Sequence, residues 1–187
     1  MRRPVVRRGL AATGMMAAVA AAGGCDRPPG TPLSAAPSLT VPASTVVPVQ
    51  SREQAETDAL AAYRGMWAAY ATAGLTANAD DPALAVVAAD PALGVLRNGL
   101  RDTHDKGQIL KGPYTTNPKV VTASPTDHPV SVLIADCLDT TNFRTYTTSG
   151  HLTDPTKGGR HATGATVRRI DGVWKVVSFG VREKGSC

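Results

Sequence analysis

The sequence predicts one α+β domain over residues 52–187, in which helices come first and antiparallel strands follow. Two observations lead to this fold class. Between residues 52 and 107, apolar side chains recur at spacings of three and four, the period of a helix with one buried face. After residue 107 the chain consists of short runs rich in Val, Ile, Thr and aromatic residues, separated by Pro, Gly, Asn and Asp, which is typical of strands.

The first helix is predicted to begin after Ser51, because Gln54 follows three residues later and completes a capping-box pattern. We expect this helix to end at Gly74. Large side chains fall on one of its faces: Leu60, Tyr63, Trp67 and Tyr70. This face either seats the helix on the sheet as core or lines an interior cavity.

Two shorter helices are predicted from the repeated motif "DPAL" at residues 81–84 and 90–93. Each copy places an Asp at the N-cap and a Pro at the first helical position. The second of these helices is expected to continue to Gly107. One of its faces carries Leu93, Leu96, Leu100 and His104.

Strand-like runs fill the rest of the chain. They cover residues 108–114, 119–124, 130–138, 142–147, 161–170 and 173–183. Asp171 and Gly172, between the last two runs, are the two-residue signal of a β-hairpin. Strands joined by such short turns pair antiparallel, which favours an antiparallel sheet.

The N-terminus has the pattern of an export signal. Four arginines within the first eight residues precede an uncharged stretch, residues 9–24, that is too short for a comfortable membrane span. Residues 22–25, Ala-Gly-Gly-Cys, resemble the lipobox of bacterial lipoproteins, with Ala22 in place of the usual leucine. The resemblance implies removal of residues 1–24 and acylation of Cys25, which would anchor the protein at the outer face of the cytoplasmic membrane. An ordinary secretory signal that leaves Cys25 as a free thiol is the alternative.

Residues 25–51 are predicted to be a lipidated cysteine followed by a disordered tether. The segment contains six prolines in 25 residues, many Ser, Thr and Ala, and almost no charge. Such a segment cannot bury enough apolar area to offset the entropy of ordering it. In the extended proline-rich conformation, at about 3.1 Å per residue, it could hold a domain up to about 75 Å from a bilayer.

The charge balance excludes nucleic acid as a partner. The full chain has a formal net charge of +5, but four of its 20 basic residues and none of its 15 acidic residues lie in residues 1–24. The remaining chain is nearly neutral and has no field to attract phosphates.

Cys137 and Cys187 remain once Cys25 is assigned to lipid, and we expect them to form a disulfide, because they are an even number in an exported protein. Closing a loop of about 50 residues would stabilise the fold by about 4 kcal/mol in the chain-entropy treatment. Two free thiols, or a bridge between molecules through Cys187, are the alternatives.

The order of the elements and the closing hairpin "DGVWKVVSF" (residues 171–179) resemble the nuclear-transport-factor-2-like superfamily. The resemblance covers residues 52–187 and implies helices packed into the concave face of a strongly curved antiparallel sheet, which form a cone with an internal pocket. The whole chain also looks like the small secreted lipoproteins of actinobacterial type that carry this domain.

Enzymes of this superfamily place Asp, His or Tyr inside the cone. Here Asp136 alternates with Val132 and Ile134, so it shares their face. If that face is concave, the Asp136 carboxylate would look into the cavity, His104 could approach it, and Tyr63, Trp67 and Tyr70 could line it. The simpler interpretation is a solvated Asp136 at a strand end, a boundary histidine at His104, and a packed aromatic core.

Three functions follow from these residues. The first is a non-catalytic, lipid-anchored protein that binds a small apolar ligand or an envelope partner. The second is a small isomerase, cyclase or hydrolase that uses Asp136 and His104. The third is a structural adaptor of a secretion or conjugation assembly. No cofactor motif is present, and no His, Cys or carboxylate spacing indicates a metal site.

Overall fold

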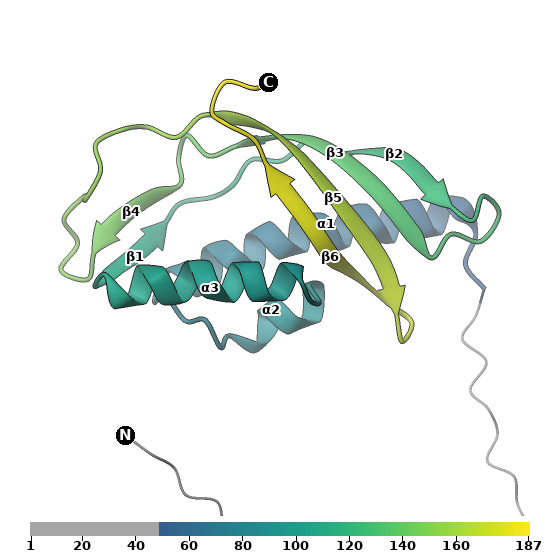
Figure 1. Cartoon of the computed structure of the whole chain (residues 1–187), viewed down its shortest axis with the longest axis horizontal. Coiled ribbons are helices and arrows are strands. Elements are labelled where there is room, and N and C mark those ends of the chain that lie inside the picture. Colours follow the sequence, from purple (N-terminus) through teal and green to yellow (C-terminus); the bar gives the residue numbers. More distant parts are fainter. Residues whose placement is uncertain (1–48) are drawn as a thin grey trace, which may run out of the picture. The chain divides into compact units, whose positions relative to one another are not determined.

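A computed structural model describes residues 49–187 of the chain (Figure 1). The predicted export signal, Cys25 and nearly all of the predicted tether lie outside the described residues. Three helices come first: α1 (Arg52–Gly74), α2 (Pro82–Val87) and α3 (Ala92–Asp105). Six strands follow: β1 (Gln108–Lys111), β2 (Lys119–Ser124), β3 (Ser131–Asp139), β4 (Arg144–Thr147), β5 (Arg160–Ile170) and β6 (Val173–Val181). The predicted α+β class is confirmed.

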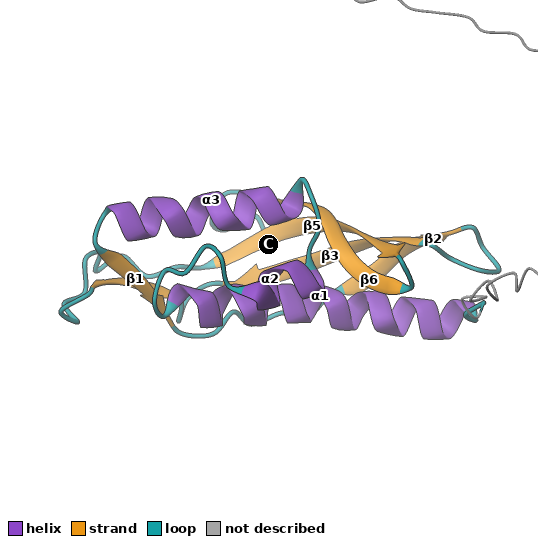
Figure 2. Cartoon of the chain, turned by 90° about the horizontal axis from the view of Figure 1, so that it is seen from below, coloured by secondary structure: helices purple, strands orange, loops and turns teal. Residues whose placement is uncertain are grey.

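The strands form two antiparallel sheets. The larger one has the order β2-β3-β5-β6, and β1 pairs with β4 in a separate two-stranded sheet. The larger sheet arches over the helices in Figure 1, and the view from below shows α1, α2 and α3 together on one side of it (Figure 2). Register shifts in β2 and between β5 and β6 mark bulges, which bend strands and increase their twist.

α1 begins at a side-chain cap and ends where β1 packs closely against it. The Ser51 hydroxyl accepts a hydrogen bond from the Gln54 amide at 3.3 Å, as the capping pattern predicts. At the other end, a Cβ on Gly74 would lie 2.8 Å from the Cβ of Leu110, so glycine lets β1 approach the helix closely. The buried face of α1 includes Ala55, Ala59, Tyr63, Met66 and Trp67.

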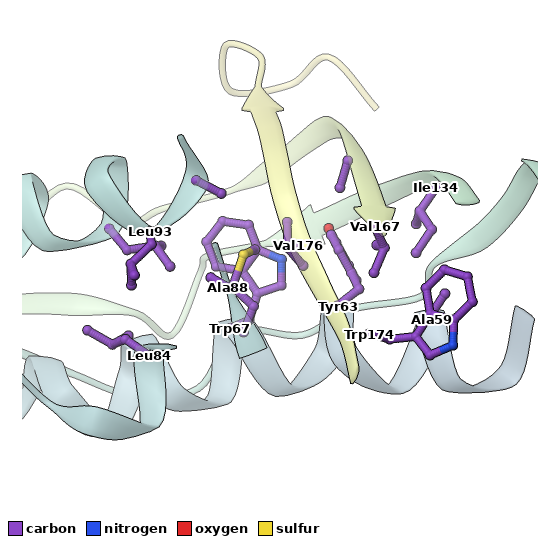
Figure 3. Packing of buried hydrophobic residues seen from close by; sticks show 14 of the residues in the cluster. Ala59, Tyr63, Trp67, Leu84, Ala88, Leu93, Ile134, Val167, Trp174 and Val176 are labelled. Atoms are coloured by element: carbon purple, nitrogen blue, oxygen red, sulfur yellow. The ribbon is translucent and has the colours of Figure 1, made fainter. Parts of the chain in front are cut away.

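The core lies between α1 and the concave face of the larger sheet (Figure 3). Tyr63 and Met66 from α1 are fully buried against apolar side chains of the strands. The strand residues that share this core include Val132, Ile134, Val167 and Val176. Each fully buried side chain of this size contributes about 1.5–3 kcal/mol, so the packed interior holds α1 on the sheet.

The two Asp-Pro motifs behave differently. Asp81 caps α2 as predicted, since its carboxylate accepts from the Ala83 amide at 2.9 Å. The prediction for Asp90 is wrong by one residue: α3 begins at Ala92, and Pro91 occupies the N-cap. The Asp90 carboxylate instead accepts from the Gly94 amide at 3.2 Å, reaching across the first turn of the helix.

His104 does not lie on the buried face of α3, so this prediction is also wrong. Its side chain is exposed, and Thr103 is buried instead. At 100° per residue, Ala92, Leu96 and Thr103 share one stripe, whose centre lies closer to Thr103 than to His104. The buried Ala92, which is not a large side chain, shifts the stripe away from the histidine.

The ordered domain includes Gln50, which the sequence assigns to the tether. Its side-chain Nε2 donates to Asp58 Oδ2 at 2.7 Å, and its Oε1 accepts from the Trp174 indole at 2.8 Å. Its backbone oxygen lies 3.2 Å from His128 Nδ1. These contacts join the end of the tether to α1, to the β2–β3 connection and to β6.

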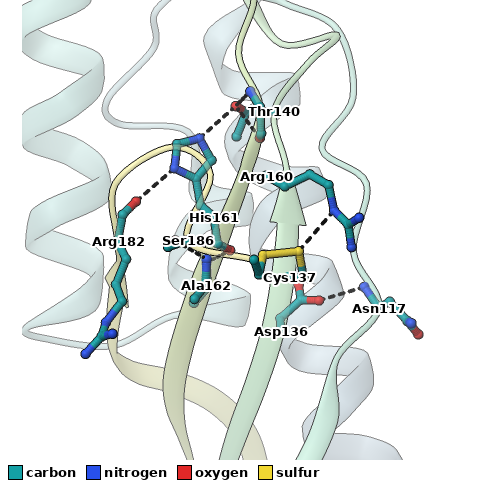
Figure 4. The surroundings of a disulfide bond; sticks show 12 residues. Asn117, Asp136, Cys137, Thr140, Arg160, His161, Ala162, Arg182 and Ser186 are labelled. Atoms are coloured by element: carbon teal, nitrogen blue, oxygen red, sulfur yellow. Dashed lines mark hydrogen bonds between the residues drawn. A yellow bond between two sulfur atoms is a disulfide. The ribbon is translucent and has the colours of Figure 1, made fainter.

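Cys137 and Cys187, the pair predicted from the cysteine count, form a disulfide (Figure 4). The Gly185 amide donates to the Arg160 carbonyl at 2.8 Å, and the Ala162 amide donates to Ser186 Oγ at 2.8 Å. The C-terminal residues are therefore fixed along the beginning of β5 by the bridge and by hydrogen bonds.

Candidate ligand pocket

The structure places Asp136 on the concave face of β3, with Val132 and Ile134, as the alternation predicts. The residue is 8% exposed, and both carboxylate oxygens are occupied. Oδ2 accepts from the Tyr63 hydroxyl at 3.0 Å, and Oδ1 accepts from the Asn117 amide at 2.7 Å. Asp136 is therefore a buried link between β3, α1 and the segment before β2, rather than a solvated strand end.

His104 does not approach Asp136. Its Nδ1 lies 3.6 Å from Asp105 Oδ1, on the exposed end of α3, beside a groove of about 460 Å³ that Arg101 also lines. Asp136 lines a different hollow of about 300 Å³ with Lys119. The acid–base pair that an enzyme of this design needs is not formed, because the exposed face of α3 turns His104 away from the sheet.

The aromatic side chains predicted on α1 belong to a larger cluster. The ring centre of Trp67 lies 4.7 Å from that of Tyr114 and 5.4 Å from that of Phe179, and Tyr114 stacks on Phe143 at 4.0 Å. Tyr70 lies 6.3 Å from Tyr114. The rings come from α1, β6, the connection between β1 and β2, and the connection between β3 and β4, so the cluster joins four separate parts of the chain.

Phe179 could not be assigned to this cluster by alternation. Trp174 and Val176 point inward, so strict alternation would place Phe179 on the opposite face. Val167 pairs with Val176 and Thr166 pairs with Ser178, which leaves one extra residue on β6. This bulge reverses the alternation and brings Phe179 against Trp67.

An apolar pocket of about 260 Å³ opens beside this cluster, between α1, α3 and β6. Trp67 and Tyr70 from α1, Leu96 from α3, Tyr114, and Phe179 from β6 form its walls. Val95 and Val181 also line it and are 55% and 43% exposed, so they form its rim. The prediction that Trp67 and Tyr70 line a cavity agrees with this geometry, whereas Tyr63, Asp136 and His104 are not among its lining residues.

The pocket keeps its tyrosine hydroxyls protonated. Burial raises the pKa of Tyr70, and the nearby Asp102 carboxylate raises it further. Burial also raises the pKa of Tyr114, with a smaller contribution from the charge that Tyr70 would carry. Beside the pocket, burial raises the pKa of Tyr63, the Trp67 indole N–H lowers it, and the charge of Asp136 raises it further. A neutral phenol can donate a hydrogen bond, so the pocket offers donors within apolar walls.

Within residues 49–187, no group of three or more His, Cys, Asp or Glu side chains is arranged to hold a metal ion. The helices of that same part of the chain are each too short or too polar to cross a membrane.

Comparison with known proteins places the fold but no family. No known family and no curated protein matches the sequence. Among solved structures, the chain is similar to the intermembrane space region of the chloroplast protein ARC6, with a TM-score of 0.53 and 14% identity over 73% of this chain and 100% of that one. Two proteins of Nostoc punctiforme, described as having a cystatin-like fold and no known function, match with TM-scores of 0.42 and 0.38, at 13% and 15% identity. They cover 74% and 70% of this chain and 96% and 78% of their own. The likeness to ARC6 shows that the domain shares an overall α+β fold with that region.

Proposed function

We propose that this protein is a lipid-anchored extracytoplasmic lipoprotein whose domain, a nuclear-transport-factor-2-like cone, binds a small apolar ligand without catalysing a reaction. The observation that carries the proposal is the aromatic pocket of about 260 Å³ between α1, α3 and β6. An apolar cavity of about 150 Å³ is large enough to hold benzene, so a molecule with one ring and a short chain fits this one. The rim residues Val95 and Val181 leave a path for the ligand to enter.

The state of the charged residues supports a binding role over a catalytic one. A general base must reach the proton that it removes. Both oxygens of Asp136 are held by Tyr63 and Asn117, and His104 lies beside another groove. The pocket itself is lined by uncharged residues.

The anchor is proposed from the sequence. The lipobox-like residues 22–25 assign Cys25 to lipid, and the proline-rich residues up to 49 would let the domain stand away from the membrane. Acylation of the α-amino group and the thiol would supply the two or more chains that stable anchoring requires.

A protein-facing role in an envelope assembly is the second candidate. It is favoured by the filled remainder of the interior, in which Tyr63, Met66, Leu84 and Leu100 have no exposed surface. Under this role the pocket would receive an apolar side chain of a partner. A partner that co-purifies after crosslinking, together with a pocket that takes up no small molecule, would favour this candidate.

The test is to fill the pocket from its rim. Val95→Trp places an indole at the opening of the pocket, and Val86→Trp places the same side chain on α2, where Val86 is 60% exposed and does not line the pocket. Binding of butylbenzene is measured with the full chain in phospholipid nanodiscs. The proposal expects saturable binding in the wild type and in Val86→Trp, and its loss in Val95→Trp.

A second rim variant, Val181→Trp, guards against a folding defect in the first, and thermal unfolding of each variant verifies the fold. Uptake of butylbenzene that is the same in all four proteins would contradict the proposed site, because it would then reflect only probe dissolved in lipid.

A further inference from the structure

The ligand pocket contains hydroxyl groups that the rest of the described chain does not satisfy. Within residues 49–187, neither Tyr70 Oη nor Tyr114 Oη has a hydrogen-bond partner, and neither is among the side-chain atoms that are fully removed from solvent. A ligand that covers such a hydroxyl displaces its hydration, so a ligand that supplies an acceptor atom is favoured over one that does not. The two hydroxyls are thus available to a molecule in the pocket.

The structure holds the Tyr70 hydroxyl in a defined place. A Cβ on Gly99 would lie 2.7 Å from Tyr70 Oη, so the oxygen packs directly against the glycine of α3. Gly99 itself lines the pocket, which places Tyr70 Oη at the pocket wall. The Tyr114 ring lies 6.3 Å from the Tyr70 ring and also lines the pocket. An acceptor atom of a bound molecule could therefore meet either hydroxyl.

The charge near the pocket selects against an anionic acceptor. Tyr70 Oη packs against Gly99, and Asp102 lies three positions further along α3 on the same side of the helix, so its carboxylate is near that hydroxyl. Lys106 Nζ lies 2.6 Å from Asp102 Oδ2 and neutralises part of that charge, but both side chains are more than half exposed, so the pairing is weak. A carboxylate ligand placed at Tyr70 would meet the same negative field, whereas a neutral carbonyl or ether oxygen would not.

We propose that this pocket recognises neutral apolar molecules that carry a hydrogen-bond acceptor, such as a ketone, an ester or an ether, through the hydroxyls of Tyr70 and Tyr114. The inference rests on the proposed function and specifies its ligand class. The apolar walls bind the body of the ligand, and the two phenols bind its oxygen. A hydrocarbon of the same shape leaves both donors unpaired, and a carboxylate is repelled by Asp102.

The test compares three probes that share a phenyl ring and a short chain: butylbenzene, butyrophenone and 4-phenylbutyrate. Because the ketone is less hydrophobic than the hydrocarbon, the informative quantity is the change in their relative affinity between the wild type and Tyr70→Phe or Tyr114→Phe. Each substitution removes one hydroxyl and keeps the ring. We expect the ketone to lose about three- to tenfold in affinity relative to the hydrocarbon, the range of one net hydrogen bond.

Tyr146→Phe is the matched control, since Tyr146 lies on β4 and does not line the pocket. Asp102→Asn tests the charge: it should strengthen the binding of 4-phenylbutyrate and leave that of butyrophenone unchanged. Thermal unfolding of each variant verifies that the fold is kept.

The outcomes separate this inference from the proposed function. Suppose that Val95→Trp abolishes the binding of all three probes, but that Tyr70→Phe and Tyr114→Phe change the affinities of the three probes by equal factors. The ligand class is then wrong, and the pocket remains a binding site. If no probe binds in a manner that Val95→Trp abolishes, the proposed function fails and the ligand class fails with it.

Discussion

The carboxylate of Asp136 shows how one residue ties the domain together. It accepts hydrogen bonds from Tyr63, 73 positions earlier in the chain, and from the Asn117 amide, 19 positions earlier. Burying a carboxylate costs free energy unless its oxygens accept hydrogen bonds, and the two donors here reduce that cost. The same two hydrogen bonds fix α1 and the segment before β2 relative to β3.

Tyr63→Phe should therefore destabilise the domain. The substitution removes only the hydroxyl and leaves one oxygen of the buried Asp136 without its donor, so the free energy of unfolding should fall by about 1–3 kcal/mol. Denaturant unfolding measures it, with Tyr146→Phe as the control. Equal stability of the two variants would contradict this role of Asp136, and so would an equal cost of Tyr63→Phe in an Asp136→Ala background.

The buried tyrosines also predict a response to alkaline pH. Burial raises the pKa of Tyr63, Tyr70 and Tyr114 above the ordinary value of about 10. A pKa that is higher in the folded state than in the unfolded state gives stability that is complete below the unfolded value and is lost as pH rises through the folded value. The free energy of unfolding should therefore fall above about pH 10.

Denaturant unfolding at a series of alkaline pH values, with tyrosinate absorbance as a second signal, measures this loss. Tyr114→Phe should reduce the slope of the decline. Ionisation of all the tyrosines at their ordinary pKa, with the fold intact, would contradict the burial of these three phenols.

At the scale of the elements, short connections determine where the pocket walls lie. Gly112, just after β1, has a φ of +108°, and a Cβ there would overlap the carbonyl oxygen of Asn142. This close crossing brings Tyr114 onto Phe143, with ring centres 4.0 Å apart. β1 accordingly ends at Lys111, earlier than the predicted run of residues 108–114.

Gly112→Ala should consequently cost more stability than Gly150→Ala. Both glycines have positive φ, at +108° and +95°, but an added Cβ on Gly150 meets no atom within 4 Å. The conformational strain alone is about 1–2 kcal/mol, and Gly112→Ala adds an overlap with backbone that cannot yield easily. Thermal unfolding of the two variants makes the comparison, and equal midpoints would show that the crossing at Asn142 is not tight.

The disulfide should stabilise the whole domain and hold its C-terminus. Its cysteines are 50 positions apart, so replacing both with Ser should lower the free energy of unfolding by about 2–4 kcal/mol. The amide of Gly185, which donates to the Arg160 carbonyl, should exchange its hydrogen faster. Unchanged stability and exchange would mean that the hydrogen bonds along β5 suffice to hold the C-terminus.

Within single elements, the sequence predicted features that depend on near neighbours and missed those that depend on distant ones. The Ser51 cap, the Asp81 cap and the concave face of β3 follow from local spacing. The bulge that turns Phe179 inward depends on the pairing of β6 with β5, and no pattern in the sequence near Phe179 predicts it. His104 was misplaced because the small Ala92, rather than a large side chain, marks one edge of the buried stripe on α3.

At the scale of the whole molecule, the order of the elements was sufficient for the fold class. The helical spacing of apolar residues covers the first part of the domain and the strand-like runs cover the second, and this order predicts the α+β class. The pocket was predictable only in part. Trp67 and Tyr70 follow from helical spacing, whereas Tyr114, Phe143 and Phe179 join them through the curvature of the sheet and the crossing at Gly112.

The most direct test of the central claim is native mass spectrometry of the full chain released from its own envelope, compared with Val95→Trp and Val86→Trp. The account predicts a wild-type protein that carries lipid at Cys25 and retains a small neutral molecule. That molecule should also accompany Val86→Trp but be absent from Val95→Trp. An empty wild-type protein, or a retained molecule that Val95→Trp does not displace, would contradict the assignment of the pocket between α1, α3 and β6 as a ligand site.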